Sequence, residues 1–318
     1  MAKWARDAGV FFLSLAAMQT FAQEYPAKPV RVLVGGGSDV IIRVVGEKLT
    51  ELWRQPVIID NRAGAGGSLA VEIVAKAPPD GYTLLLAAPT FAINAALKIG
   101  NYDYARDFAP IVQSVGHTPF VLVVHPSLPA RSVMDLIALA KARPGQLNYS
   151  SPQSGGPTHL SGDLFKMMAH VEMVHVPYKG VGSAVLAVMT GEVQLMFAVA
   201  PSVMPHINTG RLRAIAVTTA AESPLVPGVP SVAEGGLKDY EVSGWNGFLA
   251  PAGTPQAIIA KVNADALTVV KRPDVRERLM AAGYLTSADN TPAQFSDFVR
   301  REFQKWSALA KESKTTLK

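Results

Sequence analysis

Short apolar runs alternate with amphipathic stretches along the first third of the chain. A run at Val30–Val34 is followed by a segment whose apolar residues recur at helical spacing, namely Ile41, Val45, Leu49 and Leu52. Two more apolar runs, with a glycine turn and a helical pattern over residues 71–77 between them, are Val57–Asp60 and Tyr82–Leu86. Runs this uniformly apolar are typical of a parallel sheet covered on both faces, and their alternation with helices predicts βαβ units. The pattern therefore predicts an α/β fold.

The same alternation restarts after a strand predicted at Phe120–Val124. Ser132 is placed to cap a helix whose apolar residues lie within 133–140. Beyond it the pattern predicts strands at 147–150, 173–176, 193–197 and 213–218, with helices at 158–168 and 182–189 between them. After an apolar run at 240–249, helices are predicted at 255–270, 273–282 and 292–311. A second sheet-forming segment is thus followed by a helical end.

These segments can be assembled as domains in series or as two lobes joined by two crossings. A chain of 318 residues exceeds one typical domain. No flexible spacer occurs near Val121 or Phe248, which favours the two crossings. We therefore expect residues 23–122 and 247–318 to form lobe 1 and residues 123–246 to form lobe 2. The two α/β lobes would then hinge about a cleft.

The first 22 residues have the pattern of an export signal. Lys3 and Arg6 precede an apolar run from Ala8 to Met18, and small residues stand at Thr20 and Ala22. The alternative, a membrane anchor, needs about 20 apolar residues, and this run is about half as long. The chain has no cysteine, so it cannot carry a lipidated cysteine anchor. We expect residues 1–22 to be a signal peptide cleaved on export, and the product to be soluble and periplasmic.

The charge of the chain is modest and evenly spread. A formal net charge of +5 permits weak steering of anions. The basic pairs Lys271-Arg272 and Arg300-Arg301 fall on predicted helix faces and are not interleaved with aromatic residues. Nucleic acid is therefore not an expected partner.

Glycine-rich turns follow predicted strands in both halves of the chain. They lie at residues 35–39, 64–68, 154–156 and 179–183. In α/β folds such turns, at the carboxyl ends of strands and the amino ends of helices, border the ligand cleft. Free backbone N–H groups and the helix dipole make them cradles for carboxylate or phosphate. Alternatively, the glycines only relieve tight turns.

Motifs for nucleotide, catalytic and metal chemistry are missing from the sequence. Gly64-Ala65-Gly66 is followed by Leu69 where a dinucleotide fingerprint has glycine, and no loop ends in the Gly-Lys-Ser/Thr of a P-loop. There is no G-x-S-x-G or H-E-x-x-H, and the six histidines lack the spacing of metal ligands. No cofactor, metal or catalytic residue is therefore expected. His159 opens a helix at a predicted cleft loop, where it either donates to an anion or is satisfied by local backbone.

Several ordered motifs carry a resemblance to a known family. They are Tyr25-Pro26-x-Lys28-Pro29-Val30-Arg31, Gly36-Gly37-Ser38-Asp39-x-x-x-Arg43, Asn61-Arg62-x-Gly64-Ala65-Gly66-Gly67, Pro79-Asp80-Gly81-Tyr82-Thr83-Leu84, His175-Val176-Pro177-Tyr178-Lys179-Gly180 and Ala250-Pro251-Ala252-Gly253-Thr254-Pro255. Together they cover essentially the whole chain after residue 22. With these motifs the chain resembles the substrate-binding proteins of tripartite tricarboxylate transporters, the Bug-type receptors.

The resemblance implies a two-lobed, type II periplasmic-binding-protein fold of the Venus flytrap kind, with the ligand cleft between the lobes. Its implied function is to bind a small organic carboxylate (mono-, di- or tricarboxylate), as a monomer, and to deliver it to the membrane subunits of a transporter. Family receptors hold carboxylates largely through backbone amides, hydroxyls and waters. Carried over to this sequence, the ligand-facing residues are Gly36, Gly37, Ser38, Asp39, Thr90, Ser150, Ser151, Thr158, His159 and Ala198.

Two departures from the family pattern affect the expected ligand. The family has a Pro-aromatic-x-Ala stretch between the first strand and the glycines, whereas here Val34 meets Gly35 directly. The shorter loop either widens the pocket for a bulkier ligand or abolishes binding. The family also commonly has aspartate where this chain has Ala198. Since that acid would pair with a ligand ammonium group, we expect a plain carboxylate rather than an amino acid.

Three functions stay open at this point. The leading one is a transport receptor, or a degenerate family member with an altered ligand. A sensory module for a membrane kinase would need the same clamshell. An exported enzyme would depend on the loose trio Ser154, His159 and Asp163, but the i, i+4 spacing of the last two is commoner in surface pairs. We therefore do not expect an enzyme.

Overall fold

The computed structural model describes residues 25–35, 39–62 and 65–312. In the first part of the chain the strands β1 (Val30–Val34), β2 (Val57–Asn61) and β3 (Thr83–Ala87) alternate with the helices α1 (Asp39–Trp53), α2 (Ser68–Ala75) and α3 (Pro89–Ala96). The long strand β4 (Phe108–Val124) follows. The predicted α/β alternation is confirmed here, although α3 and the first half of β4 were not predicted.

The second part of the chain repeats the alternation. It contains α4 (Val133–Ala142), β5 (Asn148–Ser151), α5 (Pro157–Ala169), β6 (Val174–Pro177), α6 (Val181–Met189), β7 (Leu195–Val199), α7 (Ala200–Asn208) and β8 (Arg213–Val217). The chain ends with β9 (Ser243–Pro251), α8 (Gln256–Val270), α9 (Pro273–Ala281) and α10 (Pro292–Glu312). As predicted, Ser132 caps α4, because its hydroxyl accepts the N–H of Asp135. Helix α7 was not predicted.

The sheet is mixed rather than purely parallel. Its strand order within the described residues is β2-β1-β3-β9-β4-β7-β5-β6, and β8 pairs with β4 off this path. Strands β1, β2 and β3 are parallel to one another, as are β5, β6 and β7, which is what the apolar runs predicted. The pairs β3–β9, β4–β9, β4–β7 and β4–β8 are antiparallel. The predicted parallel arrangement therefore holds within each half only.

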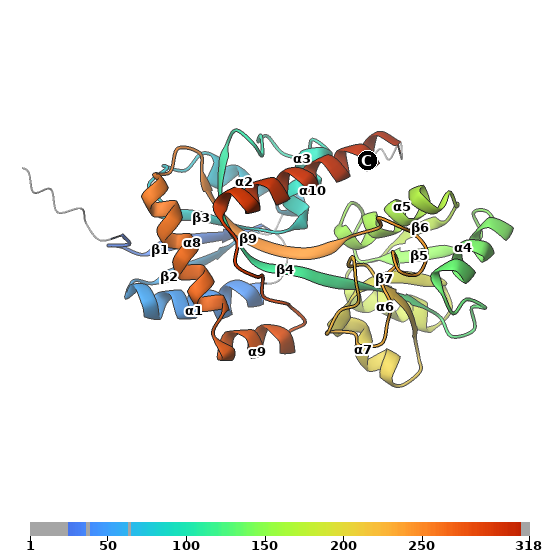
Figure 1. The fold of residues 1–318 in the computed structure, drawn as a ribbon. Helices are drawn as coiled ribbons and strands as arrows, with labels where there is room; N and C mark the ends of the chain where they lie inside the picture. Colours follow the sequence, from blue (N-terminus) through green and yellow to red (C-terminus); the bar gives the residue numbers. More distant parts are fainter. Residues whose placement is uncertain (1–24, 36–38, 63–64, 313–318) are drawn as a thin grey trace, which may run out of the picture.

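Strands β4 and β9 are shared by two lobes (Figure 1). From Phe108 to Pro119, β4 pairs with β9, and from Phe120 to Val124 it pairs with β7 and β8 instead. The pairing with β9 shifts register at three places, and within the last of them His117 has a positive φ of 50°. The lobe boundaries expected after residues 122 and 246 fall inside these two strands. The structure therefore has two lobes connected by continuous strands.

Alternate residues of the first strands enter two different cores. Val30, Val32 and Val34 of β1 pack with α1, α8 and α9, whereas Leu33 faces the core formed with α2, α3 and α10. This is the expected consequence of side chains alternating across a strand. The sheet of the first lobe is therefore covered on both faces, as its uniformly apolar strands require.

Helix α10 reaches from the first lobe towards the second (Figure 1). It contacts α3 and β4, and its far end contacts α5 of the second lobe. Phe295, Trp306 and Leu309 of α10 are buried in the same apolar cluster as Phe165 and Phe197. One core therefore continues from one lobe into the other.

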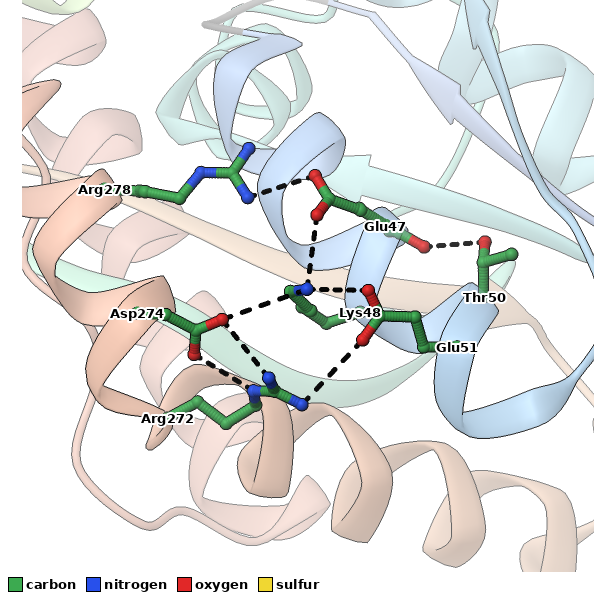
Figure 2. A network of polar contacts seen from close by, with 8 residues as sticks. Glu47, Lys48, Thr50, Glu51, Arg272, Asp274 and Arg278 are labelled. Carbon is green, nitrogen blue, oxygen red and sulfur yellow. Dashed lines mark hydrogen bonds and ion pairs between the residues drawn. The ribbon is translucent and has the colours of Figure 1, made fainter.

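An ion-pair network connects α1 to α9 on the outside of the first lobe (Figure 2). The Arg278 guanidinium lies 3.0 Å from Glu47, and the Lys48 ammonium lies 3.3 Å from Glu47 and 3.9 Å from Asp274. Hydrogen bonds from Arg278 and Lys48 hold the pKa of the Glu47 carboxyl below its ordinary value. Because most of these side chains are exposed, the network contributes little stability, and α1 is held mainly by its buried apolar face.

The contact between β9 and α10 leaves no room for a side chain at Gly247. A Cβ atom there would lie 2.3 Å from Cζ of Phe295 and 2.6 Å from the Val112 carbonyl oxygen. We expect Gly247→Ala to lower the free energy of unfolding by about 1–3 kcal/mol, since overpacking forces the neighbours apart. Gly182→Ala on α6 is the matched control, because nothing lies within 4 Å of its Cβ position. Urea unfolding should show that the control is unchanged or slightly stabilised, and equal losses in both variants would contradict this account.

Candidate functional site

A cavity of about 480 Å³ lies where the two lobes face each other. The first lobe contributes three turns and the second lobe the loop before α5 and the end of β7, with Phe120 of β4 between them. The lining residues are Gly35, Gly66, Gly67, Ala88, Pro89, Thr90, Phe120, Pro152, Gln153, Gly156, Pro157, Thr158 and Val199. Most of them follow a strand or begin a helix. The glycine turns at 35 and 66–67, and the loop at 152–158, therefore border one cavity, whereas the fourth expected turn, at 179–183, contributes no lining residue.

Two glycine turns touch each other at one edge of the cavity. A Cβ at Gly35 would lie 2.4 Å from the Gly67 carbonyl oxygen, and a Cβ at Gly67 would lie 2.1 Å from that of Gly35. Gly67 also has a φ of 90°, which favours glycine. The side-chain amide of Asn94 on α3 donates to the Gly66 carbonyl oxygen at 2.9 Å and holds the turn in place. These glycines are required by close backbone approach.

Two helices begin at the cavity with the same dipeptide. Pro89-Thr90 opens α3 in the first lobe and Pro157-Thr158 opens α5 in the second, and neither helix has a side-chain cap. Proline suits the first helical position because its missing N–H would be unsatisfied there anyway. Within the described residues, neither threonine hydroxyl has a hydrogen-bond partner, although both residues line the cavity. Each lobe thus presents a hydroxyl and the first turn of a helix to the same space.

The remaining lining is uncharged and, apart from the Gln153 amide, mostly apolar. Phe120 and Val199 form parts of the wall, with Ala88 and the prolines. No charged side chain occurs among the described lining residues. An anion bound here would therefore be stabilised by amides, hydroxyls and helix dipoles.

Of the four residues expected to face the ligand from the turn after β1, the structure describes only Asp39. Gly36, Gly37 and Ser38 lie outside the described residues. Asp39 begins α1, and its carboxylate accepts from the Arg43 guanidinium at 2.8 Å. It is not among the lining residues.

Ser150, Ser151 and Ala198 lie behind the cavity wall. All three are almost completely buried and are not among the lining residues. Ser150 donates to the Ala184 carbonyl oxygen at 3.0 Å, and Ser151 donates to that of Gln153 at 2.9 Å. Ala198 precedes the lining residue Val199 on β7. Of the ten predicted site residues, only Thr90 and Thr158 line the cavity among those that the structure describes.

His159 is satisfied within the chain. Its Nδ1 accepts the Gly155 N–H at 2.9 Å, and its Nε2 lies 3.2 Å from Asp163. The sequence left open whether His159 donates to an anion or is satisfied by local backbone. This geometry is that of a histidine bonded to local backbone. Direct contact with a ligand would require one of these bonds to break.

The His159–Asp163 pair is not on the surface, which corrects the interpretation of its spacing. Each side chain is only 6% exposed, because α5 packs against β5 and β7 at this point. Ser154, the third member of the loose trio, is exposed and bonds to neither partner within the described structure. The trio is therefore not an assembled catalytic group.

Some lining residues were missed by the sequence analysis. Phe120 was predicted only as a strand residue, because a single sequence does not distinguish an apolar pocket wall from a core. Val199 directly follows Ala198, around which the family resemblance implied ligand contacts. Helices α3 and α7 were also missed, although Pro89 and Pro201 stand in their first turns. Proline at the start of a helix was the available signal.

The described part of the chain contains neither a cluster of metal ligands nor a membrane-spanning helix. No group of three or more histidine, aspartate or glutamate side chains there is placed to hold a metal ion. Every helix in those residues is too short or too polar to cross a membrane.

Comparison with known proteins agrees with this architecture. Residues 41–314 match the family described as Tripartite tricarboxylate transporter family receptor. Protein BugT of Bordetella pertussis (strain Tohama I) is 35% identical over 318 residues, covering 98% of this chain and 97% of BugT.

Two solved structures from Rhodopseudomonas palustris are similar in both sequence and fold. R. palustris Rpa4515 with adipate has a TM-score of 0.75 and 34% identity, covering 90% of this chain and 97% of its own. MatC with bound malate has a TM-score of 0.74 and 30% identity, covering 90% of this chain and 99% of its own. The chain therefore belongs to the tripartite tricarboxylate transporter receptor family, has its periplasmic-binding-protein fold and is a binding protein, not an enzyme.

Proposed function

We propose that this protein is a periplasmic receptor that binds a small organic carboxylate between its lobes and delivers it to a tripartite tricarboxylate-type transporter. The observation that carries the proposal is the pair of Pro-Thr helix starts, which face one cavity from opposite lobes. Relatives solved with adipate and malate support the carboxylate. Export would follow cleavage after Ala22, as the sequence of the first 22 residues indicates.

In this proposal Thr90 and Thr158 hold the carboxylate from opposite sides. Each supplies a hydroxyl, and each stands in the first turn of a helix whose positive dipole end favours an anion. The turn at Gly36, Gly37 and Ser38 completes the cradle, as the family resemblance implies. Behind the wall, Ser151 supports the loop through its hydrogen bond to the Gln153 carbonyl oxygen, and Ser150 is bonded to Ala184 of α6.

The lobes would close on the ligand by bending β4 and β9. We assign the division to residues 23–122 with 247–318 on one side and residues 123–246 on the other. The register shifts of β4 between Val115 and Thr118 support bending there, because a disrupted ladder resists bending less.

The ligand in this proposal has an apolar body and no ammonium group. The described lining offers Phe120, Val199 and prolines, which suit methylene or aromatic groups. No acidic side chain is available there for an ammonium, and Ala198 stands where the family commonly has aspartate. An unsubstituted aliphatic dicarboxylate such as adipate fits this lining better than aspartate or glutamate.

The proposed ligand class implies an order of affinities that can be measured. Calorimetry should show adipate or a similar unsubstituted acid binding with a Kd of about 1 μM, equivalent to about −8 kcal/mol. Aspartate and glutamate should bind at least about tenfold more weakly, because their ammonium would be buried without a partner. Preference for the amino acids over their deaminated analogues would refute the assignment. A thermal-shift panel of carboxylates is the wider screen, since a ligand at about 100 times its Kd adds about 2.7 kcal/mol of stability.

The role of the two threonines can be tested by removing each hydroxyl in turn. Thr90→Val and Thr158→Val keep the side-chain shape but remove one hydroxyl each. A hydrogen bond to a charged group contributes about 1.5–3 kcal/mol, so each variant should bind the ligand found above at least about tenfold more weakly.

Thr268→Val is the matched control for both variants. Thr268 is exposed on α8 and donates to the Ala264 carbonyl oxygen, outside the cavity. Its affinity for the ligand should equal that of the unmodified protein. If both cavity variants behave like this control, the carboxylate does not bind between the two helix starts.

A further inference from the structure

The loop between β5 and α5 forms the second-lobe wall of the cavity. Pro152, Gln153, Gly156 and Thr158 line the cavity from this loop and the start of α5. Gly155, at its tip, has a φ of 72°, so the backbone turns there through a left-handed conformation. The position of the wall therefore depends on what holds the loop from behind.

The imidazole of His159 lies directly behind this loop. Gly155 donates its N–H to Nδ1 at 2.9 Å, and His159 is only 4% exposed. The bond joins the loop tip to the first turn of α5, four residues along the chain. The ring side of this bond is shielded from water, because His159 is buried.

Asp163 fixes which ring nitrogen carries the proton. Its carboxylate lies 3.2 Å from Nε2 of His159, and it also accepts from the Tyr149 hydroxyl at 2.8 Å and the Lys166 ammonium at 3.0 Å. A carboxylate accepts hydrogen bonds, so Nε2 carries the hydrogen and Nδ1 is left free to accept. Burial lowers the pKa of His159, which keeps the ring neutral and Nδ1 unprotonated at neutral pH.

A second histidine supports the same loop. The ring of His175 on β6 stacks on that of His159, with centroids 3.7 Å apart. Its Nε2 lies 2.7 Å from the Ser151 hydroxyl, which in turn donates to the Gln153 carbonyl oxygen at 2.9 Å. Burial, aided by the nearby His159, lowers the pKa of His175 to about 4, so this ring is also neutral. Both histidines therefore act as neutral hydrogen-bonding groups behind the wall.

We propose that His159 is a positioning residue for ligand binding, which sets the cavity wall at residues 152–158 through the Gly155 N–H bond without touching the ligand itself. This assignment rests on the proposed function, because it concerns the same cavity. It differs from the role implied by family resemblance, in which His159 faces the ligand. The geometry favours a support, since both ring nitrogens already have partners.

Two substitutions separate the two bonds of the ring. In His159→Asn the side-chain oxygen takes the place of Nδ1 and can accept the Gly155 N–H, but the contact with Asp163 is lost. In His159→Gln the terminal amide reaches towards Asp163 like Nε2, but the acceptor for Gly155 is lost. Both variants lose the stacking on His175, so that loss cancels between them.

Exchange of the Gly155 amide hydrogen, followed by NMR at neutral pH without ligand, is the first readout. We expect His159→Gln to speed this exchange by about fivefold or more, the factor that one neutral hydrogen bond corresponds to. His159→Asn should stay within about twofold of the unmodified protein, because it retains an acceptor. Equal exchange in the two variants would overturn the proposal.

The unmodified protein provides a readout that needs no variant. The ¹⁵N shifts of His159 should show a neutral ring protonated at Nε2 and unprotonated at Nδ1. A proton on Nδ1 at neutral pH would overturn the assignment even if both variants failed to fold.

Affinity for adipate, measured by calorimetry, is the third readout. His159→Gln should weaken binding by about fivefold, and His159→Asn should restore most of it. If adipate binds but both variants weaken it equally, His159 acts in another way and the proposal fails. If adipate does not bind the unmodified protein, the ligand assignment fails, while the exchange and ¹⁵N measurements still decide the role of His159.

Discussion

The site depends on one constraint: β4 and β9 are single strands that belong to both lobes. Each lobe builds its own parallel segment, and in each the carboxyl ends of the strands point towards the other lobe. Because the chain passes between the lobes in β4 and β9, the two sets of strand ends face each other across one cavity. The position of the cavity thus follows from topology before any side chain is considered.

An anion can be bound in such a cavity without an arginine side chain. Helices α2, α3, α5 and α7 all begin at lining residues or directly after them. Each helix start carries about half a positive charge and several N–H groups without intrahelical partners. Fixed dipoles require no large side chain to be ordered on binding, which limits the entropic cost.

The fold was predictable from the sequence where each strand or helix is set by its own residues. The apolar run of β1 and the capped helix α4 have local signals, and both occur as expected. The first half of β4 has no such signal, because His117 and the register shifts interrupt the alternation that identifies a strand. Thr90 and Thr158 were expected at the site because the family resemblance implied them. The Phe120 wall and the buried His159–Asp163 pair depend on contacts between distant elements, which spacing alone does not reveal.

Burying the polar cluster behind the second-lobe wall costs desolvation free energy, so the presence of the cluster needs a physical reason. Tyr149, His159 and Asp163 are all buried, and an apolar core of equal volume would avoid their desolvation. Apolar contacts, however, are not directional, and they leave a glycine-containing loop free to shift by fractions of an ångström. The hydrogen bond that the Gly155 N–H donates to a ring of fixed orientation specifies both the position of Gly155 and the direction of its N–H. In the proposed site this directional control would hold the second-lobe wall, and Thr158 directly after it, in one position relative to the first lobe.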